Sequence, residues 1–190
     1  MEQTTIYLDN NATTPLDERV FNAMKPYFFE CYGNAASNTH VFGMTAKKAV
    51  EDSRKTIANL LGAKAEEIIF TSGATESDNL AITGAIDASS KPNKHIITCA
   101  IEHKAVLDTC AVLEKKGVKV TVLPVDSNGI VSVEHLENAI TDQTVIVSIM
   151  HANNEIGSIQ PISDIGKLCK KHGVYFHTDA TQGIGKLPFN

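Results

Sequence analysis

Short runs rich in β-branched residues alternate with helix-period segments along most of this chain. The runs lie at 67–71, 95–99, 118–122, 145–149 and 174–178. Several of them are apolar almost throughout, which is typical of strands buried on both faces of a parallel sheet. Apolar residues at helical spacing predict helices over 45–61, 103–116 and 161–172. The alternation predicts an α/β fold with a mainly parallel sheet.

Composition excludes several classes of protein. The 190 residues amount to one ordinary globular domain, and 43% of them are apolar. A net charge of -5 without a basic stripe argues against nucleic-acid binding, which depends on neutralising phosphates. No run approaches the roughly 20 apolar residues that a membrane-spanning helix needs. The first residues resemble no targeting peptide, so we expect a cytoplasmic protein.

The cysteines and histidines carry only a weak metal signal. The four cysteines are scattered, without the short spacing of zinc sites, and are expected to be reduced core residues: Cys31, Cys99, Cys110 and Cys169. His151 with Glu155, and His177 with Asp179, have ligand-like spacing, but a third ligand for either pair must be assumed. Polar residues at strand ends are the favoured interpretation, and no metal is predicted.

Unusual polar segments follow four of the predicted strands. They are 72–78, Glu102-His103, 153–155 and 179–182. Because ligands of parallel α/β sheets bind beyond the carboxyl ends of the strands, these segments are expected to share one edge. Thr75 is predicted to begin a helix, with Asp78 completing a capping-box-like pair. Small residues at such a helix start also provide N–H groups for an anion, so Thr75 is either a plain N-cap or part of an anion site.

The four segments together offer an anion cradle, a flat ring, neutral hydrogen-bonding groups and a carboxylate. Pyridoxal phosphate requires these groups, because its phosphate needs N–H donors and its ring nitrogen needs an acid that keeps it protonated. The residue types alone do not decide between a pyridoxal phosphate site and the site of a generic enzyme that acts on a phosphate-bearing ligand.

Five motifs distributed over nearly the whole chain are highly specific as a set. They are residues 8–15 (LDNNATTP), 70–79 (FTSGATESDN), 102–104 (EHK), 150–157 (MHANNEIG) and 177–182 (HTDATQ). With these motifs in this order, the chain resembles the NifS/IscS-type cysteine desulfurases, which are pyridoxal-phosphate-dependent members of the class V aminotransferase family. The resemblance implies the type I aminotransferase fold and a cytoplasmic homodimer. It also implies a transferase that takes sulfur from L-cysteine onto an enzyme persulfide and releases L-alanine. The sulfur then passes to an acceptor or scaffold protein, for iron–sulfur cluster assembly or another thio-cofactor.

The resemblance also assigns roles to residues of this chain. Ala74 and Thr75 would hold the cofactor phosphate, and His103 would stack on its ring and is a candidate proton shuttle. Asp179 would pair with the protonated ring nitrogen. The phenolic oxygen would be bonded by Asn154, in preference to its neighbour Asn153, and by Gln182. The loop Ala12-Thr13-Thr14-Pro15 would border the substrate entrance.

The sequence departs from the family pattern in two ways. Ala35 stands where relatives usually carry proline, a change that loosens one loop. The family's Ser-x-His-Lys segment, whose lysine attaches the cofactor, does not occur in these 190 residues. The persulfide cysteine and the small C-terminal domain are not recognisable either. Residues 1–190 are therefore expected to be the amino-terminal part of the cofactor-binding large domain, and to turn over no cysteine alone.

The missing region has a predicted consequence for the sheet. In the family's seven-stranded sheet, two later strands lie between the first and fifth strands named above. Without them, the run at 67–71 loses its neighbours and leaves backbone groups unpaired.

Three alternatives of different classes remain. Another lyase or aminotransferase of the same fold, such as a selenocysteine lyase, could share every motif. The chain could instead be a non-catalytic truncated partner protein. A metal hydrolase built on His151, Glu155, His177 and Asp179 is the third.

Overall fold

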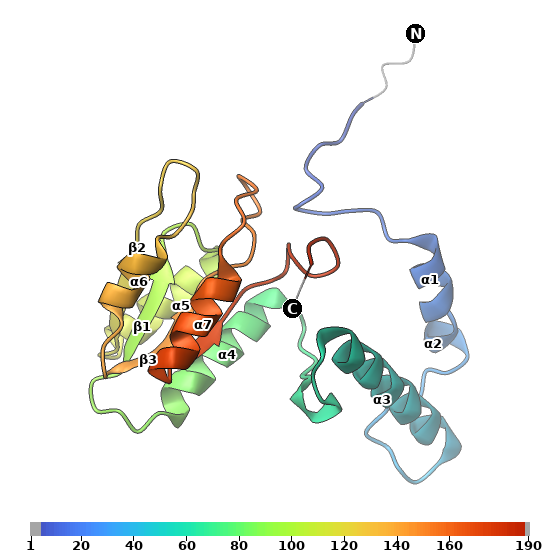
Figure 1. The fold of residues 1–190 in the computed structure, drawn as a ribbon. Helices are drawn as coiled ribbons and strands as arrows, with labels where there is room; N and C mark the ends of the chain where they lie inside the picture. Colours follow the sequence, from blue (N-terminus) through green and yellow to red (C-terminus); the bar gives the residue numbers. More distant parts are fainter. Residues whose placement is uncertain (1–4, 189–190) are drawn as a thin grey trace. The chain divides into compact units, whose positions relative to one another are not determined.

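The computed structural model describes residues 5–188, and these form two compact units. The first comprises the described residues up to Phe70 and the second those from Thr71 onward. Figure 1 shows both units, each of which is described here by itself.

The second unit is built on a four-stranded parallel sheet. Its strands are β1 (His95–Cys99), β2 (Lys119–Leu123), β3 (Thr144–Ser148) and β4 (Tyr175–His177), in the order β2-β1-β3-β4. Every neighbouring pair is parallel, and β1 pairs with β2 without interruption. All residues of the two inner strands, β1 and β3, are buried, as expected for a sheet covered on both faces. Four of the five predicted strands and the α/β class are thus confirmed.

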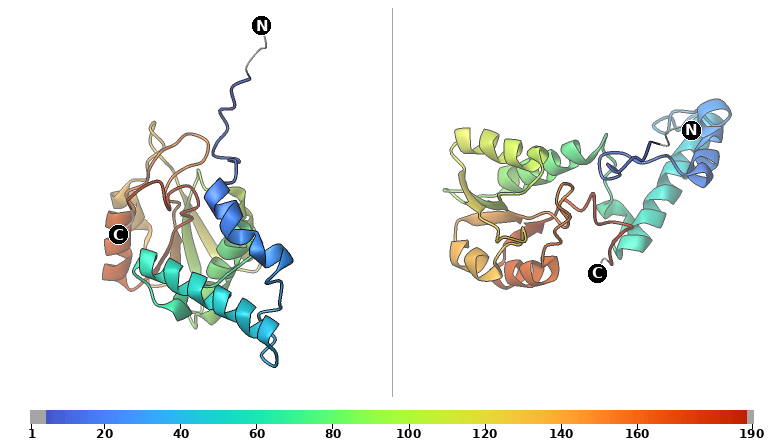
Figure 2. Two further views of the ribbon diagram at one scale, coloured as in Figure 1. Left: turned by 90° about the vertical axis from the view of Figure 1, so that its right-hand side faces the viewer. Right: turned by 90° about the horizontal axis from the view of Figure 1, so that it is seen from above.

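Four helices cover the two faces of this sheet. Figure 2 shows α4 (Ala74–Ala88) and α5 (Lys104–Lys115) on one face, and α6 (Val133–Ala139) and α7 (Ile162–His172) on the other. Each face has its own apolar core. Ile82, Val106 and Ile146 belong to the core on the α4–α5 side. Leu136 and Ile165 belong to the core on the α6–α7 side.

The first unit is helical and buries little. It contains α1 (Glu18–Met24), α2 (Pro26–Phe29), α3 (Val41–Leu61) and the 3₁₀ helix η1 (Ala65–Glu67). The predicted helix at 45–61 corresponds to α3, which ends at Gly62 in the left-handed conformation that glycine favours. The loop before α3 packs closely on it, because a Cβ at Gly33 would collide with the Phe42 carbonyl. Asn34 holds the turn that contains Ala35, since its Oδ1 accepts from the Ala36 N–H at 2.9 Å.

The strand predicted at 67–71 does not form. Glu67 ends η1, and the residues after it have no strand partner among those that the structure describes. Arg54 on α3 holds this segment instead, because its guanidinium donates to the Ile68 carbonyl and lies 4.8 Å from the centroid of the Phe70 ring. The prediction was wrong because β propensity alone does not make a strand where no backbone ladder is available.

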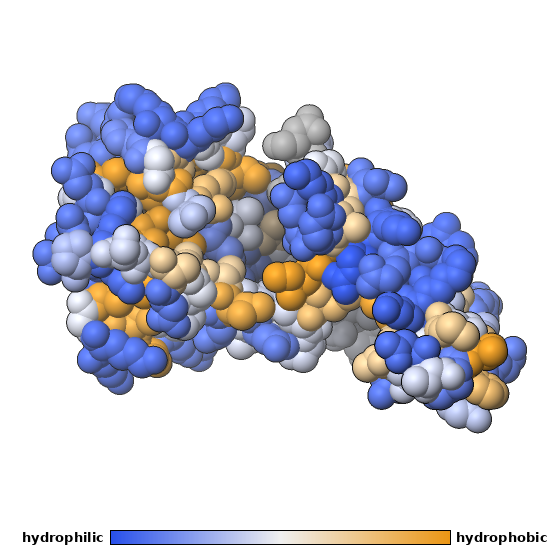
Figure 3. Space-filling view, turned by 90° about the horizontal axis from the view of Figure 1, so that it is seen from below, coloured by the Kyte–Doolittle hydropathy of each residue, from blue (hydrophilic) through white to orange (hydrophobic). Residues whose placement is uncertain are grey.

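No helix within residues 5–188 has the length and apolar character needed to cross a membrane. In the space-filling view of Figure 3, hydrophobic residues reach the surface between hydrophilic patches on both units.

Candidate functional site

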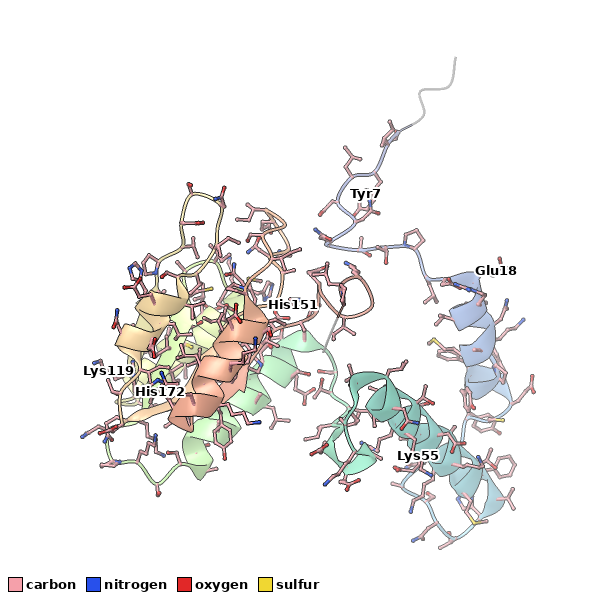
Figure 4. The ribbon with its side chains drawn as sticks, in the orientation of Figure 1. Tyr7, Glu18, Lys55, Lys119, His151 and His172 are labelled. Carbon is pink, nitrogen blue, oxygen red and sulfur yellow. The ribbon has the colours of Figure 1, made fainter. Side chains whose placement is uncertain are left out.

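Polar segments gather at one end of the sheet of the second unit. His151 lies beyond the carboxyl end of β3, whereas Lys119 at the start of β2 and His172 at the end of α7 lie at the opposite end (Figure 4). The backbone N–H of His151 donates to the Asp179 carbonyl at 2.9 Å, which extends the pairing of β3 and β4 past both strands. The predicted convergence of the segments after β3 and β4 is therefore present.

Helix α4 presents an exposed N-terminus with Ala74 and Thr75 in its first turn. The predicted capping by Thr75 and Asp78 is wrong, because the N-cap is Gly73 and the helix begins at Ala74. Glu76 makes the local bonds instead, since its Oε2 accepts from the N–H and the hydroxyl of Ser72 at 2.6 Å each. The first intrahelical bond of this turn runs from the Ser77 N–H to the Gly73 carbonyl. The N–H groups of residues 74–76 therefore precede the helical ladder and can bind an anion.

His103 is the N-cap of α5, and this fixes its ring. Its Nδ1 accepts a hydrogen bond from the Ala105 N–H at 3.1 Å. An accepting Nδ1 leaves the proton of the neutral ring on Nε2. The rest of the imidazole is exposed, so a flat partner has access to it.

Thr75 and His103 line the same hollow of about 320 Å³ between α4 and α5. The other residues of its wall come from the same two helices and include Asn79 and Asp108. Asn154, Asp179 and Gln182 do not line it. Of the six predicted residues, Thr75 and His103 thus share one hollow, Ala74 precedes Thr75 at the start of α4, and the other three lie beyond β3 and β4.

Asp179 is fixed by its own backbone turn. Its Oδ1 accepts from the Thr181 N–H at 3.0 Å. Within the described part of the chain, no lysine, arginine or histidine forms an ion pair with Asp179. Gln182 lies in the following turn, where its Oε1 accepts from the Lys186 ammonium at 2.7 Å.

The two neighbouring asparagines after β3 differ sharply. Asn153 is buried, and its side chain bonds to backbone at both ends: Nδ2 donates to the Ile101 carbonyl at 2.8 Å, and Oδ1 accepts from the Glu155 and Ile156 N–H groups. Asn154 is half-buried and donates to the Glu155 carboxylate at 3.0 Å. Asn153 therefore shapes the loop, whereas the side chain of Asn154 is the more accessible one.

A buried polar chain that the sequence analysis did not find connects α4 to β3 and β4. His177 Nδ1 lies 2.8 Å from Ser148 Oγ, and His177 Nε2 lies 3.5 Å from Asp78 Oδ1. Asp78 and Ser148 are both buried. Asp78 therefore faces the sheet instead of capping its own helix. One indication of this row of three polar side chains was present in the sequence, namely the carboxylate of Asp78 within the helix that follows the first predicted strand.

Glu102 is the other residue whose role sequence reasoning missed. It is 6% exposed, and burial raises the pKa of its carboxyl group to about 7. Hydrogen bonds from Cys99 and Met150 oppose this rise in pKa, whereas the negative charge of Asp179 adds to it. A strongly shifted pKa next to predicted site residues is typical of functional sites.

The structure offers no metal site in the region it describes. Within residues 5–188, no three His, Cys, Asp or Glu side chains are grouped closely enough to hold a metal ion. His177 of the alternative metal set is engaged with Ser148 and Asp78. The described cysteines are free thiols, and burial raises the pKa of Cys110 and Cys169 to about 11.

Comparison with known proteins decides the family. The model of the aminotransferase class-V family matches residues 6–190. The chain belongs to the aminotransferase class-V family. The protein named cysteine desulfurase IscS from Rickettsia bellii (strain OSU 85-389) is 57% identical over 185 residues, which are 97% of this chain and 45% of that protein.

Solved structures agree with this family and with the fold. One is described as a NifS-like protein, with a TM-score of 0.94 and 45% identity over 98% of this chain and 52% of that one. Another is described as SspA in complex with cysteine, with a TM-score of 0.93 and 41% identity over 98% of this chain and 53% of that one. This class-V chain therefore spans about half the length of the relatives it matches.

Proposed function

We propose that this chain is the amino-terminal part of a pyridoxal-phosphate-dependent cysteine desulfurase that transfers sulfur from L-cysteine and releases L-alanine. The observation that carries the proposal is the 57% identity, over 97% of the chain, to a protein named cysteine desulfurase IscS. The five sequence motifs support it, because they occur together and in the family's order.

The residues at the strand ends fit the proposed cofactor. The exposed first turn of α4, with Ala74 and Thr75, offers N–H groups and a hydroxyl to a phosphate. His103 offers an exposed flat ring held at a fixed orientation by the Ala105 N–H. Asp179 offers a carboxylate without an ionic partner among the described residues, which suits a protonated ring nitrogen.

In this proposal each residue of the chain has a limited task. Ala74 and Thr75 bind the phosphate, and His103 orients the ring and can pass a proton through Nε2. Asp179 holds a proton at the ring nitrogen. Asn154 and Gln182 provide neutral hydrogen bonds near the phenolic oxygen. When bound, the cofactor supplies an electron sink for bonds broken at the α-carbon of the substrate.

The wider assignments belong to the same proposal. We infer a homodimer, an acceptor or scaffold protein for the sulfur, use of that sulfur in iron–sulfur cluster or thio-cofactor synthesis, and a cytoplasmic location. We also infer that residues 1–190 do not turn over cysteine by themselves, because no Ser-x-His-Lys segment occurs in them.

Replacement of Asp179 in the complete product of the gene tests the proposal. Asp179→Ala is expected to lower the rate of alanine formation from cysteine by about 100-fold or more, because the ring nitrogen loses its charged partner. Circular dichroism checks that the fold survives. Asp164→Ala is the matched control, since Asp164 is exposed on α7 and pairs with Lys167 in the same helix. An unchanged rate in Asp179→Ala would contradict the assignment.

A further inference from the structure

Glu102 is a buried acid in the short segment between β1 and α5, directly before His103. Its Oε1 accepts two hydrogen bonds, from the Met150 N–H at 2.7 Å and from the Cys99 thiol at 3.0 Å. Its Oε2 is buried and has no hydrogen-bond partner within residues 5–188. One carboxyl group thus combines an oxygen with two partners and an oxygen with none.

The two partners of Oε1 lie at the ends of two neighbouring strands, β1 and β3. Cys99 is the last residue of β1, and Met150 begins the segment after β3 that carries Asn154. The bond from Asn153 Nδ2 to the Ile101 carbonyl joins the same two segments. Glu102 therefore helps to fix where the segment from Met150 to Asn154 leaves the sheet.

Glu102 has no ion-pair partner among residues 5–188, and its two charged neighbours act on its pKa in opposite directions. The negative charge of Asp179 raises the pKa of Glu102, whereas His177, which is bonded to Ser148 and lies beside Asp78, lowers it by less than burial raises it. Ionised Glu102 would leave Oε2 as a buried carboxylate oxygen without a donor, which is costly.

The thiol of Cys99 fixes which oxygen of Glu102 acts as the acceptor. Burial raises the pKa of Cys99, so this thiol stays protonated and keeps donating to Oε1. With Oε1 accepting from both of its partners, the proton of a neutral Glu102 belongs on Oε2.

We propose that Glu102 is a positioning residue of the cofactor site that works as a neutral acid. Its Oε1 ties the segment carrying Asn154 to the end of β1, and the proton on Oε2 leaves Asp179 as the charged carboxylate of this region. This inference rests on the proposed function for the identity of the bound group. The raised pKa of about 7 for Glu102 supports the same protonation state.

Two variants of the complete gene product separate these two tasks. Glu102→Gln keeps an oxygen that can accept from the Met150 N–H, but its side chain cannot ionise. Glu102→Ala removes this acceptor altogether. Glu114→Gln, at an exposed position on α5, is the matched control.

The cofactor-free protein is titrated with pyridoxal phosphate at pH 6, where neutral Glu102 dominates, and binding is followed by absorbance. We expect Glu102→Gln to bind within about threefold of wild type, and Glu102→Ala to bind at least about tenfold more weakly.

The second measurement is the thermal unfolding midpoint of the cofactor-free proteins between pH 5 and 8. We expect the midpoint of wild type to fall with rising pH relative to that of Glu102→Gln, because ionisation of the buried acid is removed in the variant. Binding by Glu102→Ala as tight as wild type would overturn the positioning role. Binding by Glu102→Gln as weak as that of Glu102→Ala, or parallel pH profiles of wild type and Glu102→Gln, would overturn the neutral-acid role.

The outcomes also separate this inference from the proposed function. If wild type itself binds no pyridoxal phosphate, the proposed function fails, and the pH profiles still test the protonation of Glu102. If Glu102→Ala does not fold, the comparison of wild type with Glu102→Gln decides alone.

Discussion

The two units of this chain bury their apolar residues to very different extents. In the second unit, both faces of the sheet are covered, and residues such as Ile97 and Ile165 are fully buried. In the first unit, the buried residues among those described are only Gly43, Ala46 and Ala58, all on α3. Helix α1 buries none of its residues, and Phe29 and Leu60 remain 72% and 81% exposed.

This contrast shows that apolar helices and strands become a packed core only where neighbouring elements cover their apolar faces. Each strand–helix unit of the second region has a neighbour that covers its apolar face, so its helices and strands support one another. The apolar residues of the first region have no such cover within the described residues. Exposed apolar surface of this extent is typical of a face that other protein covers.

Truncation of one apolar residue in each unit gives the largest expected difference. Ile165→Ala removes a fully buried side chain and should lower the free energy of unfolding by about 3 kcal/mol. Leu60→Ala should change it by less than about 0.5 kcal/mol, because this side chain is 81% exposed. Urea unfolding of the 190-residue chain measures both. Equal losses would show that the contrast between the units is wrong, and a large loss for Leu60→Ala only in the complete gene product would show that another part covers α3.

The acid Glu102 should make the second unit sensitive to pH. Its pKa in the folded state is about 7, above its usual 4.5, so the folded protein binds more protons than the unfolded chain between these values. Stability should therefore fall as pH rises from 4.5 to 7, by about 3 kcal/mol in total. The difference in unfolding free energy between wild type and Glu102→Gln isolates this contribution. A difference that does not vary with pH would contradict it.

Close packing at the strand ends provides a test of intermediate size. A Cβ at Gly183 would collide with Nδ1 of the His151 ring, so Gly183→Ala should cost about 2 kcal/mol. Gly84→Ala is the control, because no atom lies near that position and alanine favours the helix α4 by up to about 1 kcal/mol. Thermal unfolding should move the two midpoints in opposite directions. A tolerated Gly183→Ala would show that the turn after Asp179 does not pack on His151.

The smallest effect is expected at the end of the first unit. Arg54→Ala removes the donor to the Ile68 carbonyl and the cation above Phe70, with an expected loss of about 1 kcal/mol. Hydrogen exchange over residues 64–70 should accelerate in this variant. Arg19→Ala, which removes only an exposed local pair with Asp17, should leave that segment unchanged. No change in exchange for Arg54→Ala would mean that other contacts hold the segment.

The success and failure of the sequence predictions follow the same contrast. The strands at 95–99 and 145–149 were predictable because buried parallel strands are mostly apolar and rich in β-branched residues. The run at 67–71 is also rich in isoleucine, but a strand needs a ladder partner as well. The family resemblance, and not the local sequence, predicted that this run loses its neighbours. Thr75 illustrates a smaller failure, since the N-cap is Gly73 and Glu76 bonds back to Ser72, and competing local bonds of this kind are nearly equal in energy.

The site was predictable where its residues act through type and motif, and not where they act through burial. Thr75 and His103 share a hollow, as two residues assigned to one ligand should. Glu102 and the Asp78–His177–Ser148 chain depend on contacts between α4, β1, β3 and β4, which are distant in sequence. The motifs predict which residues face a ligand, whereas tertiary packing determines which residues hold those segments in place.

Alanine formation from L-cysteine in the presence of pyridoxal phosphate tests the central proposal most directly. It should be measured for the complete product of the native gene and for residues 1–190 alone. We expect steady alanine formation by the complete product and none by the 190-residue chain. No alanine from the complete product, or sustained alanine formation by residues 1–190 alone, would contradict the account.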